Sequence, residues 1–203
     1  MGRQDRQAAL AICQTLAVVA SVLTFVAPAF AQWSGFARDS QHSAQSSVSA
    51  QTLNRVIWST PVDLSPQSVG GTLRIHYGSP LVTSANTVIV PVKTGTAGGF
   101  RVDARRGTDG SLIWSLPTDY VLPPSSQFIP VFGPVLTSKP RLYFPGIGGT
   151  VYFRDNPDAV CSGAHCQRQL AFFGKKNYRK RRAAYNASVR INTPVSADSA
   201  GNI

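Results

Sequence analysis

An internal repeat constrains the fold of this chain more than any other feature. Residues 80–91 (PLVTSANTVIVP) and residues 134–145 (PVLTSKPRLYFP) align without a gap, 54 residues apart. Each segment has a proline, two aliphatic residues, Thr-Ser, three linking residues, three apolar residues and a second proline. A third copy begins at Pro194. Units that recur at such a period are typical of repeat architectures, so the chain is expected to stack similar units.

The same order of elements follows each complete copy. After the first copy, strands are expected at 100–104 and 112–116, joined by the hairpin signal Asp109-Gly110. Their counterparts in the second unit are 150–153 and 169–173. Together with the two strands inside each copy, every unit is predicted to be four short antiparallel strands.

Composition favours an all-β chain. It contains 17 glycines, 14 prolines and no glutamate, so every acidic residue is an aspartate, which suits turns better than helices. Strands such as 88–90 and 142–144 are apolar throughout, as in a sheet that is covered on both faces. We therefore predict a partial β-propeller with four-stranded blades at 79–117 and 133–174. A β-sandwich is the alternative, but a sandwich gives no reason for the sequence repeat.

Two tryptophans are expected to pack between blades. Trp114 lies four residues after Gly110 on the outermost strand, where a flat ring can cover the seam with the adjoining blade. Its burial would contribute roughly 2 to 3 kcal/mol, so its predicted role is structural. Trp58 has the same local pattern, and residues 55–62 are predicted to be the outer strand of a preceding blade. Residues 189–203 are predicted to start the next blade.

The N-terminus has the pattern of a secretory signal. Two arginines within the first six residues precede the apolar run 8–27, and Ala-Phe-Ala at 29–31 provides small residues for cleavage. Residues 1–31 are therefore predicted to be a signal helix, followed by a lead-in segment at 32–54. An uncleaved anchor is the alternative, because the run is long enough to span a bilayer. Either way the chain is expected to be exported, to the periplasm or the extracellular space, and cleavage would leave no transmembrane span.

Export changes the interpretation of the cysteines. Cys161 and Cys166 enclose a short loop, and in an oxidising compartment they are expected to form a disulfide. The alternative is a metal site with His165 as third ligand, which is a weak pattern because no second ligand cluster accompanies it. No metal site is predicted.

These patterns resemble the PQQ-like (quinoprotein-type) β-propeller repeat. The motif residues that carry the resemblance are Ser79-Pro80, Thr87-Val88, Asp103-Ala104, Gly110 and Trp114. Residues 33–42 are similar to the opening seen before the first blade in such proteins. The second unit departs from the pattern, because the cysteine loop occupies the turn and Phe172 or Phe173 stands where a tryptophan is expected. Two complete units cannot close a ring of about four to eight blades, which implies the N-terminal portion of a longer protein.

The resemblance implies two kinds of function. A PQQ-dependent dehydrogenase would need a calcium ion held by carboxylate and amide oxygens, a catalytic aspartate and an aromatic floor beneath the quinone. The sequence has no glutamate and no adjacent cysteine pair. His76-Tyr77, just before the first inner strand, could face the axis, but a His and a Tyr beside a strand are more often ordinary packing residues. We therefore favour a non-catalytic binding or scaffold module for a protein or glycan partner, with no cofactor and no catalytic residue assigned.

Charge provides a third hypothesis. The net charge is +11, and six cations fall within eight residues at 175–182. This run could contact an anionic lipid, polysaccharide or nucleic acid, with Tyr178 available for stacking. The simpler interpretation is a solvated loop between the second and third blades. The candidate contact residues are Lys175, Lys176, Tyr178, Arg179, Lys180, Arg181 and Arg182.

Overall fold

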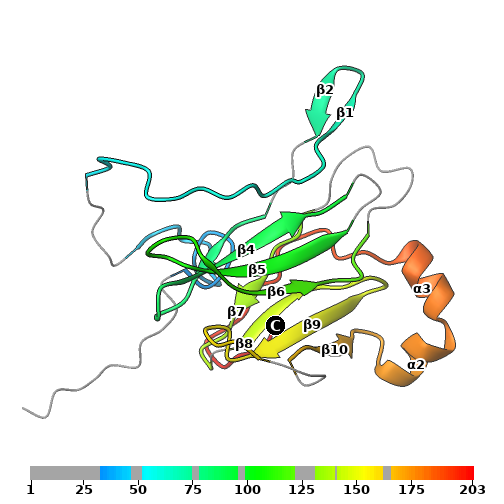
Figure 1. Cartoon of the computed structure of the whole chain (residues 1–203). Helices are drawn as coiled ribbons and strands as arrows, with labels where there is room; N and C mark the ends of the chain where they lie inside the picture. Colours follow the sequence, from blue (N-terminus) through cyan, green and yellow to red (C-terminus); the bar gives the residue numbers. More distant parts are fainter. Residues whose placement is uncertain are drawn as a thin grey trace, which may run out of the picture.

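Two four-stranded antiparallel sheets form most of the regular structure (Figure 1). The computed structural model describes residues 33–46, 52–74, 78–95, 99–121, 131–139, 141–161 and 166–203. The predicted signal helix, residues 1–31, lies outside the described residues. The chain is mostly β, as the composition and the repeat predict.

The first sheet consists of consecutive strands in the predicted unit 79–117. Its order is β3-β4-β5-β6, and each strand pairs antiparallel with the next. β-branched residues dominate β4, as expected for a strand that packs on both faces. The bounds are β3 (Leu81–Val82), β4 (Thr87–Lys93), β5 (Phe100–Arg106) and β6 (Leu112–Pro117).

The second sheet repeats this arrangement within the predicted unit 133–174. Its order is β7-β8-β9-β10, again with antiparallel neighbours throughout. The bounds are β7 (Val135–Leu136), β8 (Arg141–Pro145), β9 (Thr150–Asp155) and β10 (Arg168–Ala171). The prediction of four antiparallel strands in each unit is confirmed.

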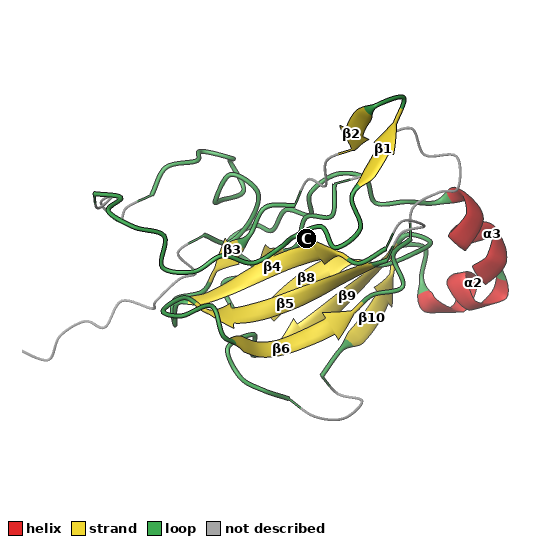
Figure 2. Ribbon diagram, turned by 45° about the horizontal axis from the view of Figure 1, so that its top comes forward, coloured by secondary structure: helices red, strands yellow, loops and turns green. Residues whose placement is uncertain are grey.

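The two sheets lie against each other and share a core (Figure 2). The register of the first sheet places Ile89, Ala104 and Trp114 opposite one another on one face. Leu142 and Phe144 of the second sheet pack in the same cluster. Burial of this apolar seam stabilises the contact between the units.

The sheets stack head to tail. The repeat offset of 54 residues relates Ile89 to Tyr143 and Val88 to Leu142. Ile89 and Leu142 lie in the shared core, whereas Tyr143 lies in a separate cluster with Val135 and Phe153. The first sheet packs against the second with the face that carries Ile89. The second sheet packs against the first with its opposite face, the one that carries Leu142, the counterpart of Val88. Equivalent faces point the same way along the stack, as in a heterologous contact.

The lead-in segment connects the first strands of both sheets, β3 and β7. Trp33 forms a bridge with Val82 of β3, and its backbone N–H donates to the Val82 carbonyl at 3.1 Å. The carbonyl of Ser34 accepts from the backbone N–H of Leu136 in β7 at 2.7 Å. One short segment therefore pairs with the first strand of each unit.

Pro91 lies within its strand. β4 continues to Lys93, and Pro91 pairs with Val102 of β5. β3 pairs only with Val88 and Ile89, so Pro91 lies where β4 has no partner from β3. A proline is tolerated at such a position because its missing N–H leaves no ladder bond unmade on that side.

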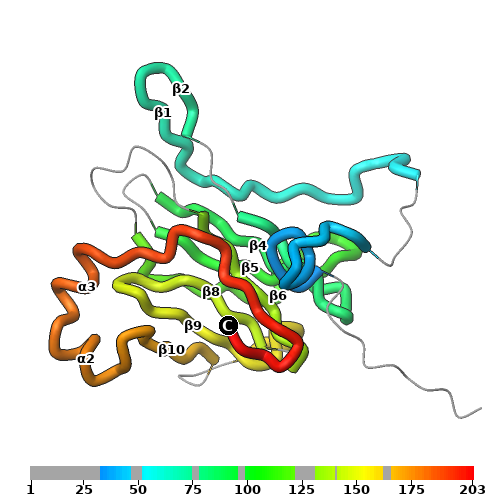
Figure 3. Tube along the Cα trace, turned by 180° about the vertical axis from the view of Figure 1, so that it is seen from behind, coloured from blue at the N-terminus to red at the C-terminus, as the bar shows by residue number. Residues whose placement is uncertain are grey.

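Two predicted partial strands are absent from the described residues. Residues 55–62 are extended without a ladder, and the neighbouring Leu64 N–H donates to the Lys93 carbonyl at 2.9 Å. Residues 189–203 run over the outer side of the second sheet, with one bond of 3.2 Å from Val195 N–H to the Gly133 carbonyl (Figure 3). Neither segment forms a ladder within the described residues, because a strand requires a neighbour to pair with along its length. Their assignment to a preceding and a following blade stays a prediction.

One hairpin and two helices were not predicted. The hairpin of β1 (Gln67–Val69) and β2 (Thr72–Arg74) turns at Gly70 and Gly71, whose φ angles are 57° and 80°. A Gly-Gly pair is a known signal for such a turn, so this hairpin could have been found. The basic run, interpreted as a loop, instead forms α2 (Lys175–Lys180) and α3 (Arg182–Ser188). Lysine, arginine and alanine favour the helical conformation, which explains these two helices.

No helix in the described part of the chain has the length and apolarity to cross a bilayer.

Candidate functional site

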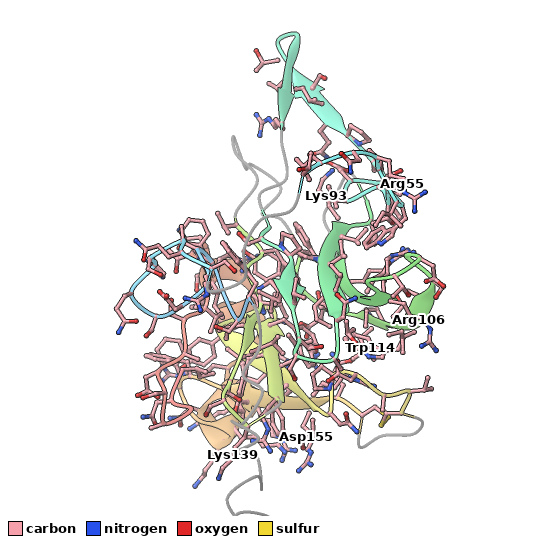
Figure 4. All side chains as sticks on the ribbon, turned by 90° about the vertical axis from the view of Figure 1, so that its left-hand side faces the viewer. Arg55, Lys93, Arg106, Trp114, Lys139 and Asp155 are labelled. Carbon is pink, nitrogen blue, oxygen red and sulfur yellow. A yellow bond between two sulfur atoms is a disulfide. The ribbon has the colours of Figure 1, made fainter. Side chains whose placement is uncertain are left out.

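Trp114, on the first sheet, packs against the second unit and bonds to it. Its side chain is 7% exposed, and its indole N–H donates to the Pro157 carbonyl at 2.7 Å. The guanidinium of Arg154 lies 4.3 Å from the centroid of the ring, and burial lowers the pKa of this arginine. Pro157 and Arg154 both belong to the second unit, and Figure 4 shows Trp114 between the ribbons of the two sheets. The ring thus covers the seam between the units.

Trp58 makes the equivalent contact with the first sheet. Its indole N–H donates to the Gly107 carbonyl at 2.9 Å. A Cβ added to Gly110 would lie 2.7 Å from the ring, so the indole packs directly on the turn. Gly107 lies in the turn between β5 and β6, as Pro157 lies in the turn between β9 and β10. Trp58 therefore contacts the first sheet as Trp114 contacts the second.

Buried charges on the first sheet were not predicted. Alternation along β5 places Arg101, Asp103 and Arg105 on the outer face. The Asp103 carboxylate accepts from Arg101 at 2.9 Å, from the Ser115 hydroxyl at 2.7 Å and from Arg105 at 3.4 Å. The Arg-x-Asp-x-Arg spacing could have indicated this cluster. Its carboxylate is fully engaged by its own strand and the next, which makes it a structural group.

The buried ammonium of Lys93 is also structural. It donates to the Asp63 carboxylate at 2.7 Å and to the Ser65 carbonyl at 2.5 Å. These bonds fix the segment before β1 to the end of β4. Nothing in the local sequence indicates a pair between residues so far apart.

The cysteines lie at disulfide distance. The Sγ atoms of Cys161 and Cys166 are 2.06 Å apart. His165, the third ligand of the alternative metal site, lies outside the described residues, as does the His76-Tyr77 pair. Among the residues that the structure describes, no three His, Cys, Asp or Glu side chains gather in a group that could hold a metal ion.

The basic run and β10 enclose an open hollow of about 550 Å³. Three of the six cations of the run line this hollow: Lys175, Arg179 and Arg182. Arg168 of β10 adds a fourth cation, and no acidic side chain is among the lining residues. The remaining cations of the run, Lys176, Lys180 and Arg181, do not line it. We refer to this hollow, lined by Arg168, Lys175, Arg179 and Arg182, as the basic hollow.

Tyr178 is not available for stacking as expected. It is 6% exposed, and its hydroxyl donates to the Asn186 Oδ1 at 2.9 Å. A Cβ added to Gly148 would lie 2.9 Å from its ring, so the ring is pressed against that turn. Since it lies on the inner side of α2, Tyr178 positions the helix, while the cations of the run around it are exposed.

Phe172 and Phe173 do not replace the tryptophan of the first unit. β10 ends at Ala171, and Phe172 is 86% exposed beyond it. In the second sheet, Arg168 of β10 pairs with Phe153 of β9, as Trp114 of β6 pairs with Ala104 of β5 in the first sheet. Arg168 therefore holds the position of the tryptophan. The prediction that Phe172 or Phe173 takes the place of the tryptophan was wrong, because the turn that contains the cysteines differs in length from the turn between β5 and β6.

Comparisons of the chain with protein-family models, with curated proteins and with solved structures find no match. Its function has to be inferred from the residues themselves.

Proposed function

We propose that this chain is part of a PQQ-like β-propeller that serves as a non-catalytic binding or scaffold module. The observation that carries this proposal is the equivalence of Trp58 and Trp114. Each indole donates to a carbonyl in the turn between the third and fourth strands of the next unit, at 2.9 Å and 2.7 Å. A link that recurs from unit to unit is what a circular stack of blades requires.

The head-to-tail stacking supports a propeller over a sandwich. In a ring, each blade presents the same face to the blade that follows. Val88 lies on the outer face of the first sheet, and its counterpart Leu142 is buried against that sheet. Ile89 is buried in the seam, and its counterpart Tyr143 lies on the outer face of the second sheet. Both ends of the stack could therefore accept a further unit.

The segments over the two outer faces fit this proposal. Residues 55–62 bring Trp58 to the place where the outer strand of a preceding blade would lie. The third copy of the repeat, which begins at Pro194, lies beside Gly133 at the start of the second unit. Leu53, Val56 and Ile57 are largely exposed. The other strands of a preceding blade would cover these apolar side chains.

Export is part of the same proposal. A disulfide persists in an oxidising compartment, which supports a periplasmic or extracellular location. A rigid frame of stacked sheets with variable connections is suited to holding a protein or glycan partner, and the function then belongs to sites on the frame.

Titration with PQQ in the presence of Ca²⁺ tests the non-catalytic part of this proposal. We expect no saturable change in tryptophan fluorescence and no PQQ-dependent reduction of a dye with alcohol or aldose substrates. Ca²⁺ without PQQ provides the baseline. Saturable quenching together with dye reduction would contradict the proposal and would favour a PQQ-dependent dehydrogenase.

A further inference from the structure

We infer that the basic hollow is a binding site for an acidic polysaccharide, whose carboxylate or sulfate groups would pair with its cations. The inference rests on the geometry of β10, α2 and α3 and does not depend on the propeller assignment. It divides the six cations of the run into two groups with different roles.

The lining cations come from three elements, α2, α3 and β10. Lys175 and Arg179 are four residues apart on α2, so helical periodicity places them on one face of that helix. Arg182, at the start of α3, lines the same hollow. Arg168 lies on β10, which contacts α2. Four cations therefore surround one concavity, and several anionic groups of one chain could be bound together.

The charge of the hollow is largely uncompensated. Within the described part of the chain, no ion pair involves Lys175, Arg179 or Arg182. Arg168 shares Asp155 with Arg141, at 3.2 Å and 2.5 Å. A group of exposed cations, three of which have no ion pair among the described residues, attracts anions and favours charge-assisted hydrogen bonds.

The helices that carry these cations are held in place. The Tyr178 hydroxyl bonds Asn186, which ties α2 to α3. The ring of Tyr185 stacks on Phe173 with centroids 4.9 Å apart, which ties α3 to the end of β10. A site that is ordered before binding loses less conformational entropy when the ligand arrives.

The shape and the aromatic residues favour a polysaccharide over the other polyanions. The two rings that line the hollow, Phe153 and Tyr178, are only 8% and 6% exposed. They offer no open face for the base stacking on which single-stranded nucleic acids depend. A lipid surface would reach residues that protrude rather than those that line a concavity. A flexible glycan with charges spaced along its chain can enter the hollow.

Two matched triple variants of the full chain test this inference. K175Q/R179Q/R182Q removes three lining cations, and K176Q/K180Q/R181Q removes three that do not line the hollow, so the net charge falls equally. With heparin and polygalacturonate as sulfated and carboxylated probes, the first variant should bind at least one of them about tenfold more weakly, because three exposed ion pairs are lost. The second variant should bind each probe within about threefold of the unchanged protein.

Three outcomes would overturn the inference. Equal weakening by both variants would mean that the whole positive surface, and not the hollow, attracts the probe. Tighter binding of single-stranded DNA than of either glycan would assign the site to nucleic acid, and tighter binding of phosphatidylglycerol vesicles would assign it to a membrane. Circular dichroism and thermal unfolding of both variants show that the comparison is made between folded proteins.

Discussion

At the scale of single residues, buried aromatic side chains close the end of the shared core. Tyr120 is fully buried, and its hydroxyl donates to the Ile191 carbonyl at 2.6 Å. Its ring contacts Phe100 and Phe132, with centroids 5.5 Å and 5.6 Å away. Burial raises the pKa of Tyr120 to about 12, because the phenolate would lose its hydration there.

Stability should therefore fall at alkaline pH. An unfolded tyrosine ionises near pH 10 and folded Tyr120 near 12, so its stabilising contribution is complete below pH 10 and is lost as pH rises toward 12. The loss attributable to Tyr120 is about 2 kcal/mol. Urea unfolding across this range should show a smaller decline for Tyr120→Phe than for the unchanged protein. Identical declines would mean that Tyr120 is not shielded from water.

The roles of single residues could be predicted only where the signal was local. The place of Trp114 at the seam followed from a hairpin signal four residues earlier and from its position on an outer strand. The pair of Lys93 with Asp63 joins segments that only the tertiary fold brings together. The burial of Tyr178 likewise depends on Asn186 and on the turn at Gly148.

At the scale of elements, the repeat predicted where strands should lie, and only the predicted strands that have a neighbouring strand to pair with are formed. Both complete units contain their four strands, because each strand has its neighbour nearby in the sequence. Residues 55–62 have strand-like composition and no ladder partner in the described chain. α2 and α3 lack the apolar periodicity that reveals a helix, since Tyr178 is their single well-buried residue.

The turn at Gly110 should be sensitive to a single methyl group. Gly110 has a φ of 72°, and an added Cβ would lie 2.7 Å from the Trp58 ring. Gly110→Ala should cost about 2 kcal/mol and change the fluorescence of Trp58, because backbone strain and a steric clash combine. Gly70→Ala, with a φ of 57° and open space around it, carries the strain alone and should cost about 1 kcal/mol. Equal midpoints of denaturation for the two variants would argue against the contact of Trp58 with this turn.

At the scale of the whole molecule, the direction of stacking distinguishes the possible architectures. Arg168 is the counterpart of Trp114 in the second sheet, because the two residues hold the same position in the strand register. If the sheets packed through equivalent faces, Trp114 would therefore contact Arg168. In the head-to-tail arrangement it meets Arg154 instead, 4.3 Å from the ring. The repeat in the sequence predicted two similar units. It did not predict the direction of packing, because the strands are apolar on both faces and the sequence does not show which face is turned outward.

A pair of double-mutant cycles measures this direction. Unfolding free energies of Trp114→Leu, Arg154→Met and the double variant should give a coupling of about 1 kcal/mol, because the ring and the guanidinium interact directly. The same cycle with Arg168→Met should give a coupling below about 0.3 kcal/mol. Coupling of Trp114 to Arg168 and not to Arg154 would contradict the head-to-tail stack, and with it the propeller.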